Sequence, residues 1–380
     1  MTDIIIAVRR LKGLTGASRI VFAQLQQLRQ QGYSVSVFAE KADQARLRDL
    51  GVHFKRCPRL PLLNRYWTGR WFNYCFQRYR KHCKNSPLVI GHGDIEQQDI
   101  LFLHNIVQRE QAALGILCAP AVKHVIQLHY RLLTQQAFTY CIANLQLMKD
   151  ELIKTFSIPA EKIYVAHPGY NPDQFDVSHK PIYRKALREK LKLKDHEVVV
   201  GLITSGSFFK RGLDICLQTM AQLPESAQHN TKLLLVGNIQ EIQALKQKYA
   251  PQFPENNLLI VPKTSAIEHV YSAMDIFFYP ARLEEFGLVL QEAAVFGLPI
   301  LTSINTGASE LFTGIGRDFV ITSNQPSDYL SSLIQLIEDR NLREKLGQCL
   351  QACTQHNTER YYLEKIEQIL ENNTSNLQLS

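Results

Sequence analysis

Residues 276–302 read IFFYPARLEEFGLVLQEAAVFGLPILT. One short apolar run opens the stretch at 276–279, and a second closes it at 299–302. Between these runs, apolar residues recur at helical spacing over 288–296, directly after Gly287. Two buried strands joined by a helix form a βαβ unit, whose strands are parallel. This stretch therefore predicts an α/β fold.

The same alternation runs through the rest of the chain. It begins with a strand at 4–8, a helix at 17–31 and a strand at 34–39. The chain has 380 residues, more than one hydrophobic core usually supports, so two domains are expected. Proline and glycine punctuate 163–169, where we place the linker. The predicted fold is two Rossmann-like, doubly wound α/β domains that face a cleft.

Three segments are expected along the chain. Residues 1–167 form an N-terminal domain, and residues 168–357 form a C-terminal domain. Residues 358–380 form a helix that packs back toward the N-terminal domain, followed by a polar tail. Further strands are expected at 88–91, 100–104, 140–143, 198–204, 232–237 and 258–261, and further helices at 213–223, 239–249, 266–273, 326–355 and 361–371.

Composition and charge narrow the class of protein. Hydrophobic residues make up 45% and charged residues 21%, as in ordinary globular proteins. The net charge of +8 favours an anionic partner, although a solvated basic surface explains it equally well. Eight cysteines without a CxxC pair indicate reduced thiols. With no signal peptide and no window of about 20 apolar residues, we expect a cytoplasmic protein or a peripheral one on the cytoplasmic face of the inner membrane.

The loop and helix after the strand at 276–279 carry the residues best suited to ligand binding. Ligands of open α/β sheets bind beyond the carboxyl ends of the strands. Glu284 precedes the helix and can hold sugar hydroxyls or stabilise a developing positive charge, whereas Glu292 lies on the helix and can accept hydrogen bonds from a ribose. Gly287 lets a ligand approach the backbone, where the amides of Gly287 and Leu288 are suited to phosphate. Taken alone, the two glutamates fit surface residues around a helix start better than a ligand site.

In this context the segment resembles the family-4 retaining glycosyltransferases of the GT-B fold. Their E-x-F-G motif, followed by a second glutamate, is matched by Glu284, Phe286, Gly287 and Glu292. Within that family the chain is most similar to the lipopolysaccharide core glucosyltransferases, which add a hexose to a heptose. The matches to that group lie at 166–169, 206–214, 223–226 and 229–231.

The resemblance implies the reaction class. It implies a nucleotide-diphosphate sugar as co-substrate, a UDP- or GDP-sugar, and transfer that retains the anomeric configuration without a metal or other cofactor. It implies a lipid-linked or oligosaccharide acceptor, bound by the N-terminal domain, while the C-terminal domain binds the nucleotide sugar. The leaving phosphate then takes the acceptor proton, so no general base is expected. The chain has no D-x-D motif, which argues against the metal-chelating glycosyltransferase design.

The resemblance also implies a set of donor-binding residues. Lys210 and Arg211 would stabilise the departing diphosphate, and which phosphate each contacts is left open. Glu284 would hold the donor sugar. Gly16 belongs to a small-residue loop after the first strand that resembles the corresponding loop of the family. The expected donor-binding residues are Gly16, Ser207, Lys210, Arg211, Phe286, Gly287, Leu288 and Glu292.

Histidines follow two expected strands of the N-terminal domain. The family often has a histidine near the reacting sugar, so His104 is expected to act in catalysis together with Glu284. The alternative for His104 is a structural histidine at a strand end. His92, Asp94 and Asn105 are candidates for binding the acceptor.

Residues 65–84 combine both tryptophans of the chain with many basic residues. Aromatic side chains suit a membrane interface, and basic ones attract anionic lipid. An ordinary helix with an aromatic core face is an equal alternative, and single-stranded nucleic acid is a weaker one. We expect an anionic membrane surface as partner and no nucleic acid. The residues predicted to face the membrane are Trp67, Arg70, Trp71, Arg78, Arg80 and Lys81.

Two other functions fit the same fold. A two-domain protein that binds a sugar or a nucleotide without catalysis would use the same cleft. A phosphorylase of similar fold would need a pyridoxal cofactor, for which no lysine motif is present. Transfer or hydrolysis of the donor separates an enzyme from a binding protein.

Overall fold

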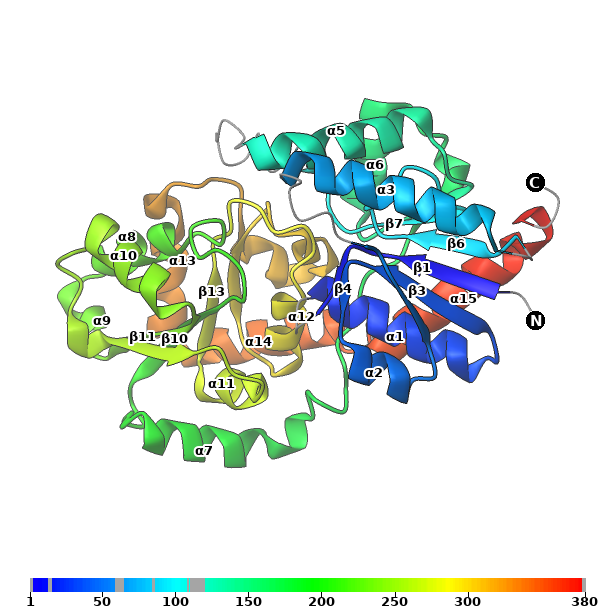
Figure 1. The fold of residues 1–380 in the computed structure, drawn as a ribbon. Helices are drawn as coiled ribbons and strands as arrows, with labels where there is room; N and C mark the ends of the chain where they lie inside the picture. The colour runs from blue at the N-terminus through cyan, green and yellow to red at the C-terminus, as the bar shows by residue number, and fades with distance from the viewer. Residues whose placement is uncertain are drawn as a thin grey trace. The chain divides into compact units, whose positions relative to one another are not determined.

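The structure is a computed structural model that describes residues 3–12, 16–58, 65–83, 86–107, 109 and 120–377. The chain divides into two compact units (Figure 1). Unit 1 contains Met1–Pro168 and Arg360–Ser380, and unit 2 contains Gly169–Glu359. Each unit is built on a parallel sheet with helices against it. The predicted α/β class is therefore confirmed.

The described residues of unit 1 form a seven-stranded parallel sheet. Its strands are β1 (Asp3–Ala7), β3 (Ser34–Ala39), β5 (His53–Arg56), β6 (Leu88–Gly91), β7 (Ile100–Leu103), β8 (Tyr140–Ala143) and β9 (Ile163–Val165). They lie in the order β5-β3-β1-β6-β7-β8-β9. The short strands β2 (Arg10–Leu11) and β4 (Lys41–Ala42) form a separate pair. The chain order reverses between β1 and β6, which is the switch point where such sheets bind ligands.

Helices cover both faces of this sheet. They are α1 (Gly16–Gln30), α2 (Gln44–Asp49), α3 (Arg65–Lys81), α5 (Pro120–Gln135), α6 (Gln146–Phe156) and α15 (Glu359–Leu377). Figure 1 shows α1 and α15 on one face and α3 on the other. Ile4 and Ile6 of β1 join the core under α1 and α15, whereas Ile5 joins the core under α3. Successive strand residues point to opposite faces, so a strand covered on both sides is apolar throughout.

The last helix contributes to the core of unit 1. Tyr362 and Ile366 of α15 are buried in the same cluster as Leu25 of α1. The Gln27 side-chain amide donates to the Leu363 carbonyl at 3.1 Å. The helix continues to Leu377, so the predicted end of the helix at 371 was too early.

Unit 2 has a six-stranded parallel sheet. Its strands are β10 (Val198–Ile203), β11 (Thr231–Gly237), β12 (Leu258–Pro262), β13 (Ile276–Tyr279), β14 (Ile300–Ser303) and β15 (Val320–Ile321). They lie in the order β12-β11-β10-β13-β14-β15. The reversal between β10 and β13 is the switch point of this sheet, and the loops after these two strands meet there.

Eight α-helices belong to unit 2. They are α7 (Lys180–Lys190), α8 (Leu213–Ala221), α9 (Glu225–His229), α10 (Ile239–Tyr249), α11 (Ile267–Ala273), α12 (Leu288–Val295), α13 (Pro326–Glu338) and α14 (Arg340–Thr354). Helix α8 packs against α10 and α13, whereas α12 packs against α14. Right-handed crossovers place α8 and α10 on one face of the sheet and α11 and α12 on the other.

The single helix predicted at 326–355 is wrong. The chain breaks at Asp339, whose backbone is extended with φ −103° and ψ 101°. The Asp339 side chain accepts a hydrogen bond from the Leu342 amide at 2.9 Å and so caps α14. Aspartate is favoured at this position because it satisfies an amide that has no partner within the helix. A charged residue inside a helical apolar pattern therefore marked a boundary.

Three further observations concern the described part of the chain. None of its helices combines the length with the apolar character that crossing a bilayer requires. Within the same residues, no group of three or more histidine, cysteine or acidic side chains is arranged to hold a metal ion. The seven described cysteines are free thiols, and Cys118 lies outside the described residues.

Candidate functional site

The loop after β13 holds Glu284 by both its backbone and its side chain. The Glu284 amide donates to the Asn305 carbonyl at 2.9 Å, and the Gly307 amide donates to the Glu284 carbonyl at 2.9 Å. These bonds form an isolated parallel bridge to Thr306, beyond the end of β14. The Tyr279 hydroxyl donates to Oε2 of Glu284 at 2.9 Å. Glu284 is thus positioned at the switch point before any ligand binds.

Arg211 lies beside the same carboxylate. Its Nε is 2.7 Å from Oε2 of Glu284, and the two side chains are 15% and 17% exposed. The Nε–H does not point at that oxygen, so the contact is an ion pair rather than a hydrogen bond. Nη1 of Arg211 donates to the Leu283 carbonyl at 2.7 Å. Burial, together with the neighbouring Glu284, raises the pKa of Tyr279 well above its usual value, so this hydroxyl stays protonated and donates.

Gly287 directly precedes α12 and lies in the left-handed region of backbone space. Its φ is +92°, and a Cβ there would lie 2.9 Å from Cγ of Glu284 and 3.2 Å from Cγ2 of Thr306. No side chain caps α12 at this end. The Phe286 carbonyl accepts from the Ala308 amide at 2.6 Å, which holds the loop against the segment after β14. First-turn amides without a side-chain cap are suited to bind an anion.

Glu292 lies on α12 in a buried position, with 3% of its surface exposed. The Tyr271 hydroxyl, on α11, donates to Oε2 of Glu292 at 2.8 Å. Tyr271 is itself fully buried. A buried carboxylate needs hydrogen-bond donors, and this tyrosine supplies one of them. Sequence reasoning missed Tyr271 and Tyr279, because the spacing of residues along a helix or strand does not show where a hydroxyl points.

The loop between β10 and α8 brings the predicted donor residues Ser207, Lys210 and Arg211 to the same edge. The Ser207 hydroxyl donates to Oε1 of Glu241 at 2.8 Å, and this oxygen also accepts from the Phe208 amide at 2.8 Å. The Lys210 carbonyl accepts from the Arg282 amide at 3.0 Å. The backbone of this loop is therefore tied both to α10 and to the loop after β13.

A second ion pair joins the two loops. Nη1 and Nη2 of Arg282 lie 2.5 Å and 2.6 Å from the two carboxylate oxygens of Asp214, which is 3% exposed. The Arg282 guanidinium also lies 4.4 Å from the ring centroid of Phe209. Bidentate pairs of this kind fix geometry as well as charge. No motif in the sequence indicated this pair.

The two candidate histidines of unit 1, His92 and His104, form a hydrogen bond with each other. Nδ1 of His92, after β6, lies 2.8 Å from Nε2 of His104, after β7. Their rings are nearly parallel, at 8°. Burial lowers the pKa of His104 to about 4, and burial with repulsion from His104 lowers that of His92 well below its usual value. Both rings are therefore neutral near pH 7, and one nitrogen donates to the other.

Among the remaining candidates of unit 1, Asp94 follows β6, Asn105 follows β7, and Gly16 begins α1. Oδ2 of Asp94 accepts from the Arg9 amide at 2.8 Å, and burial raises the pKa of Asp94. Asn105 is half-buried, directly after His104. Gly16 is the exposed first residue of α1. The other residues of its loop, 13–15, lie outside the described residues.

The basic aromatic stretch forms α3, and part of it belongs to the core. Phe72 and Phe76 are fully buried against Phe38, with ring centroids 5.2 Å and 5.4 Å from it. The Trp71 indole donates to the Pro58 carbonyl, and Arg80 lies 3.4 Å from Asp99. The ordinary-helix alternative therefore accounts for one face of α3. The exposed residues of the predicted membrane face are Trp67, Arg70, Arg78 and Lys81, beside exposed Tyr74.

The buried histidines predict an acid-sensitive fold. Burial lowers the pKa of His104 and of His129, on α5, from 6.5 to about 4. Between these values the unfolded chain binds more protons than the native one, so the free energy of unfolding falls as the pH drops from about 6.5 to 4. Urea unfolding at several pH values measures this. The free energy of unfolding should depend less steeply on pH in His129→Gln than in the parent protein, whereas exposed His53→Gln should leave the dependence unchanged. The same pH dependence in all three proteins would show that His129 does not cause it.

Comparison with known proteins agrees with this geometry. A model described as Glycosyltransferase Family 4 matches residues 14–174, and one described as Glycosyl transferases group 1 matches residues 184–350. This chain is a family-4 glycosyltransferase. Relatives of this glycosyltransferase include the lipopolysaccharide glucosyltransferase WaaG of Escherichia coli strain K12, which is 25% identical over 67% of this chain and 70% of that protein. The capsular polysaccharide biosynthesis glycosyltransferase CapM of Staphylococcus aureus is 26% identical over 55% of each chain.

Solved structures show the fold of this glycosyltransferase to be GT-B. The crystal structure of WaaG matches with a TM-score of 0.79 at 18% identity, over 96% of this chain and 99% of that one. The complex of Anabaena HepE with UDP-glucose matches with a TM-score of 0.77 at 17% identity, over 98% of this chain and all of that one. The chain is therefore an enzyme that transfers a sugar, and not a binding protein without catalysis.

Proposed function

We propose that this glycosyltransferase moves a hexose from a nucleotide-diphosphate sugar to a lipopolysaccharide core or a related cell-surface glycan. The transfer retains the anomeric configuration and uses no metal ion. The observation that carries the proposal is the convergence of Arg211, Glu284 and the uncapped start of α12 at one switch point. The relatives support it by their names: WaaG is a lipopolysaccharide glucosyltransferase, and HepE was solved with UDP-glucose.

The residues of unit 2 divide the work of holding the donor. The diphosphate lies against Lys210, Arg211 and the amides of Gly287 and Leu288, which stabilise the charge that develops as the sugar leaves. The Glu284 carboxylate, held by Tyr279, binds the hydroxyls of the transferred sugar. Fixed donors and acceptors are effective because they need no reorganisation during the reaction.

Glu292 binds the ribose in this proposal. One of its oxygens accepts from Tyr271, so the carboxylate is held in place as a hydrogen-bond acceptor. In unit 1, His104 acts beside the reacting sugar, and its neutral state lets it donate or accept a hydrogen bond. His92, Asp94 and Asn105 contribute to acceptor binding. The exposed face of α3 contacts an anionic membrane surface that carries the lipid-linked acceptor.

Donor and acceptor specificity test the proposal directly. A thermal-shift panel of UDP- and GDP-sugars should show a selective rise in melting temperature, because a ligand that binds only the native state stabilises it. The selected donor is then incubated with lipopolysaccharide core lacking its outer hexoses, with and without EDTA, and the anomeric configuration of the product is read by NMR. An inverted product, loss of transfer in EDTA, or no shift with any nucleotide sugar would each refute part of the proposal.

Replacing Glu292 tests its proposed role in binding the donor nucleotide. Glu292→Gln should weaken binding of the donor nucleotide by about 10- to 100-fold, since hydrogen bonds to a charged group contribute roughly 1.5–3 kcal/mol. Isothermal titration with the selected nucleotide measures the change. Tyr271→Phe keeps the carboxylate and removes one hydrogen bond to it, so it should have a smaller effect. If Glu292→Gln bound the donor nucleotide as tightly as the parent protein, Glu292 would not belong to the donor site.

A further inference from the structure

Unit 2 has a cavity at the edge of its sheet opposite the donor residues. Val198, Asp275 and Pro299 line it, directly before or at the beginnings of β10, β13 and β14. Its volume is about 310 Å³, at the lower end of the range for small-molecule sites. Strand β13 separates the two edges, with Asp275 before it and Tyr279 at its end. The proposed donor site makes no use of this cavity.

Basic side chains from two helices line the cavity. Lys180 and Arg184 come from α7, and Arg340 and Arg343 come from the first turn of α14. Met274, Leu298 and Pro299 supply an apolar part of the wall. The carboxylates in the lining are Asp195, Glu197, Asp275 and Glu344.

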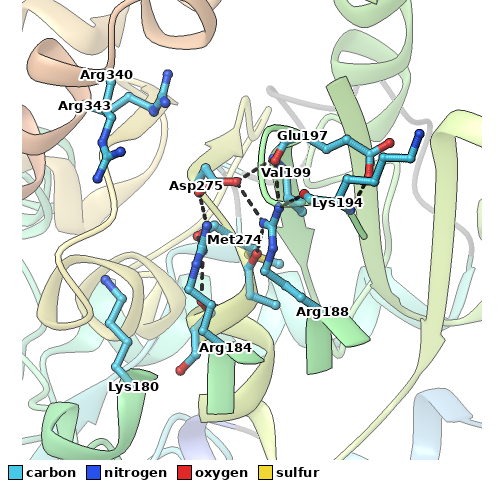
Figure 2. A network of polar contacts seen from close by, with 12 residues as sticks. Lys180, Arg184, Arg188, Lys194, Glu197, Val199, Met274, Asp275, Arg340 and Arg343 are labelled. Carbon is cyan, nitrogen blue, oxygen red and sulfur yellow. Dashed lines mark hydrogen bonds and ion pairs between the residues drawn. The ribbon is translucent and has the colours of Figure 1, made fainter. Parts of the chain in front are cut away.

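Most of these carboxylates already have basic partners. Asp275 lies 2.6 Å from Arg184 and 3.2 Å from Arg188, and it also accepts from the Val199 amide at 2.8 Å. Figure 2 shows this network. In the same way Glu344 pairs with Arg340 at 2.8 Å, and Glu197 pairs with Lys232 at 3.4 Å. Asp195 is exposed. Asp275 therefore balances one of the two charges of Arg184 and Arg188, and Glu344 balances the charge of Arg340.

The side chains of Lys180 and Arg343 contact backbone carbonyls instead of carboxylates. Within the described residues, neither has a carboxylate at ion-pair distance. Lys180 donates to the Phe296 carbonyl, and Nη1 of Arg343 donates to the carbonyls of Leu336 and Ile337 at 2.7 Å and 2.8 Å. In Figure 2 the two side chains extend toward each other. Burial lowers the pKa of both groups, and repulsion from Arg184 adds to the effect on Lys180. Attraction to Asp275 opposes the lowering at both groups, as does attraction to Asp339 and Glu344 at Arg343, but the pKa of each group stays lowered.

We propose that this cavity binds a small phosphorylated anion between Lys180 and Arg343. An anion there would supply the countercharge that the carboxylates do not supply, and it would relieve the repulsion between Lys180 and Arg184. Arginine binds phosphate through paired N–H groups, and lysine adds a compact point charge. The apolar wall accommodates the organic part of the molecule. The phosphate belongs either to a soluble metabolite or to a lipid headgroup.

Pyrophosphate is a suitable first probe. Isothermal titration of the full chain with sodium pyrophosphate should show binding that Lys180→Gln weakens at least 10-fold and that Lys180→Arg largely retains. Lys345→Gln, an exposed residue of α14 outside the cavity, is the matched control and should bind like the parent protein. Hydrogen exchange should slow in peptides from the starts of α7 and α14. Circular dichroism checks that each variant is folded, and Arg343→Gln replaces Lys180→Gln if the latter is not.

The donor site binds phosphate in our proposed function, so a second variant separates the two sites. Arg211→Gln should keep the exchange protection at α7 and α14. Protection confined to 206–212 and 284–292, or pyrophosphate affinity unchanged by Lys180→Gln, would overturn the second site whatever happens to sugar transfer. Cosedimentation with phosphatidylglycerol vesicles identifies the source. Loss of vesicle binding in Lys180→Gln assigns the phosphate to a lipid, whereas pyrophosphate binding without vesicle binding assigns it to a soluble metabolite.

Discussion

Glu284→Gln is expected to lower kcat/KM for sugar transfer by about 100-fold or more. The substitution keeps the size of the side chain and removes the charge that pairs with Arg211 and strengthens the hydrogen bond from Tyr279. The loss of one fixed electrostatic partner at a reacting centre typically costs about 10²- to 10³-fold in rate. Initial rates at several donor concentrations measure the change. Because the backbone bridge to Thr306 is unaffected, the loop should keep its place.

The neighbouring glutamate is the matched control. Glu285→Gln makes the same chemical change one residue later, in the same loop, at a position that the family motif leaves variable. It should retain transfer within a few-fold of the parent enzyme. If both variants retained activity, Glu284 would not contact the transferred sugar; if both lost it equally, the loop charge rather than Glu284 would be responsible.

Gly212→Ala is expected to lower the free energy of unfolding by roughly 3–5 kcal/mol, near the upper limit for single substitutions. Gly212 has φ +73°, and a Cβ there would lie 1.9 Å from the Pro280 carbonyl oxygen. The Pro280 carbonyl cannot easily move, because hydrogen bonds hold the residues on both sides of it. The Thr302 hydroxyl donates to the Tyr279 carbonyl at 2.8 Å, and the Ser303 hydroxyl donates to the Ala281 carbonyl. The clash would push apart the two loops that carry Arg211 and Glu284. Urea unfolding of the purified variant measures the loss.

Gly32→Ala separates the clash from the backbone strain. Gly32 has a similar φ, +84°, but a Cβ there would meet nothing within 4 Å. Its replacement should therefore cost only about 1 kcal/mol, the usual penalty of a left-handed conformation for alanine. Equal destabilisation by the two substitutions would show that strain, and not contact with Pro280, sets the cost at Gly212.

The regular elements of unit 2 follow from local pattern. Helix α10 and strand β13 have the predicted bounds, because their apolar spacing and flanking turn residues are unambiguous. Helix α7 was not predicted. Its sequence, KPIYRKALREK, is mostly charged, and it is held by long-range bonds such as that of Arg184 to Asp275, which no local pattern contains.

The chain's own sequence determined the α/β class, the loop after β13 and the glycosyltransferase motif of Glu284 and Glu292. These features are local, since each depends on the spacing of residues within about ten positions. Only the tertiary structure decided that Arg211 lies against Glu284, that tyrosines hold both carboxylates, and that Lys180 and Arg343 extend toward each other across a cavity. Such contacts join residues from different strands and helices, and strand order and packing, which no local spacing encodes, bring them together.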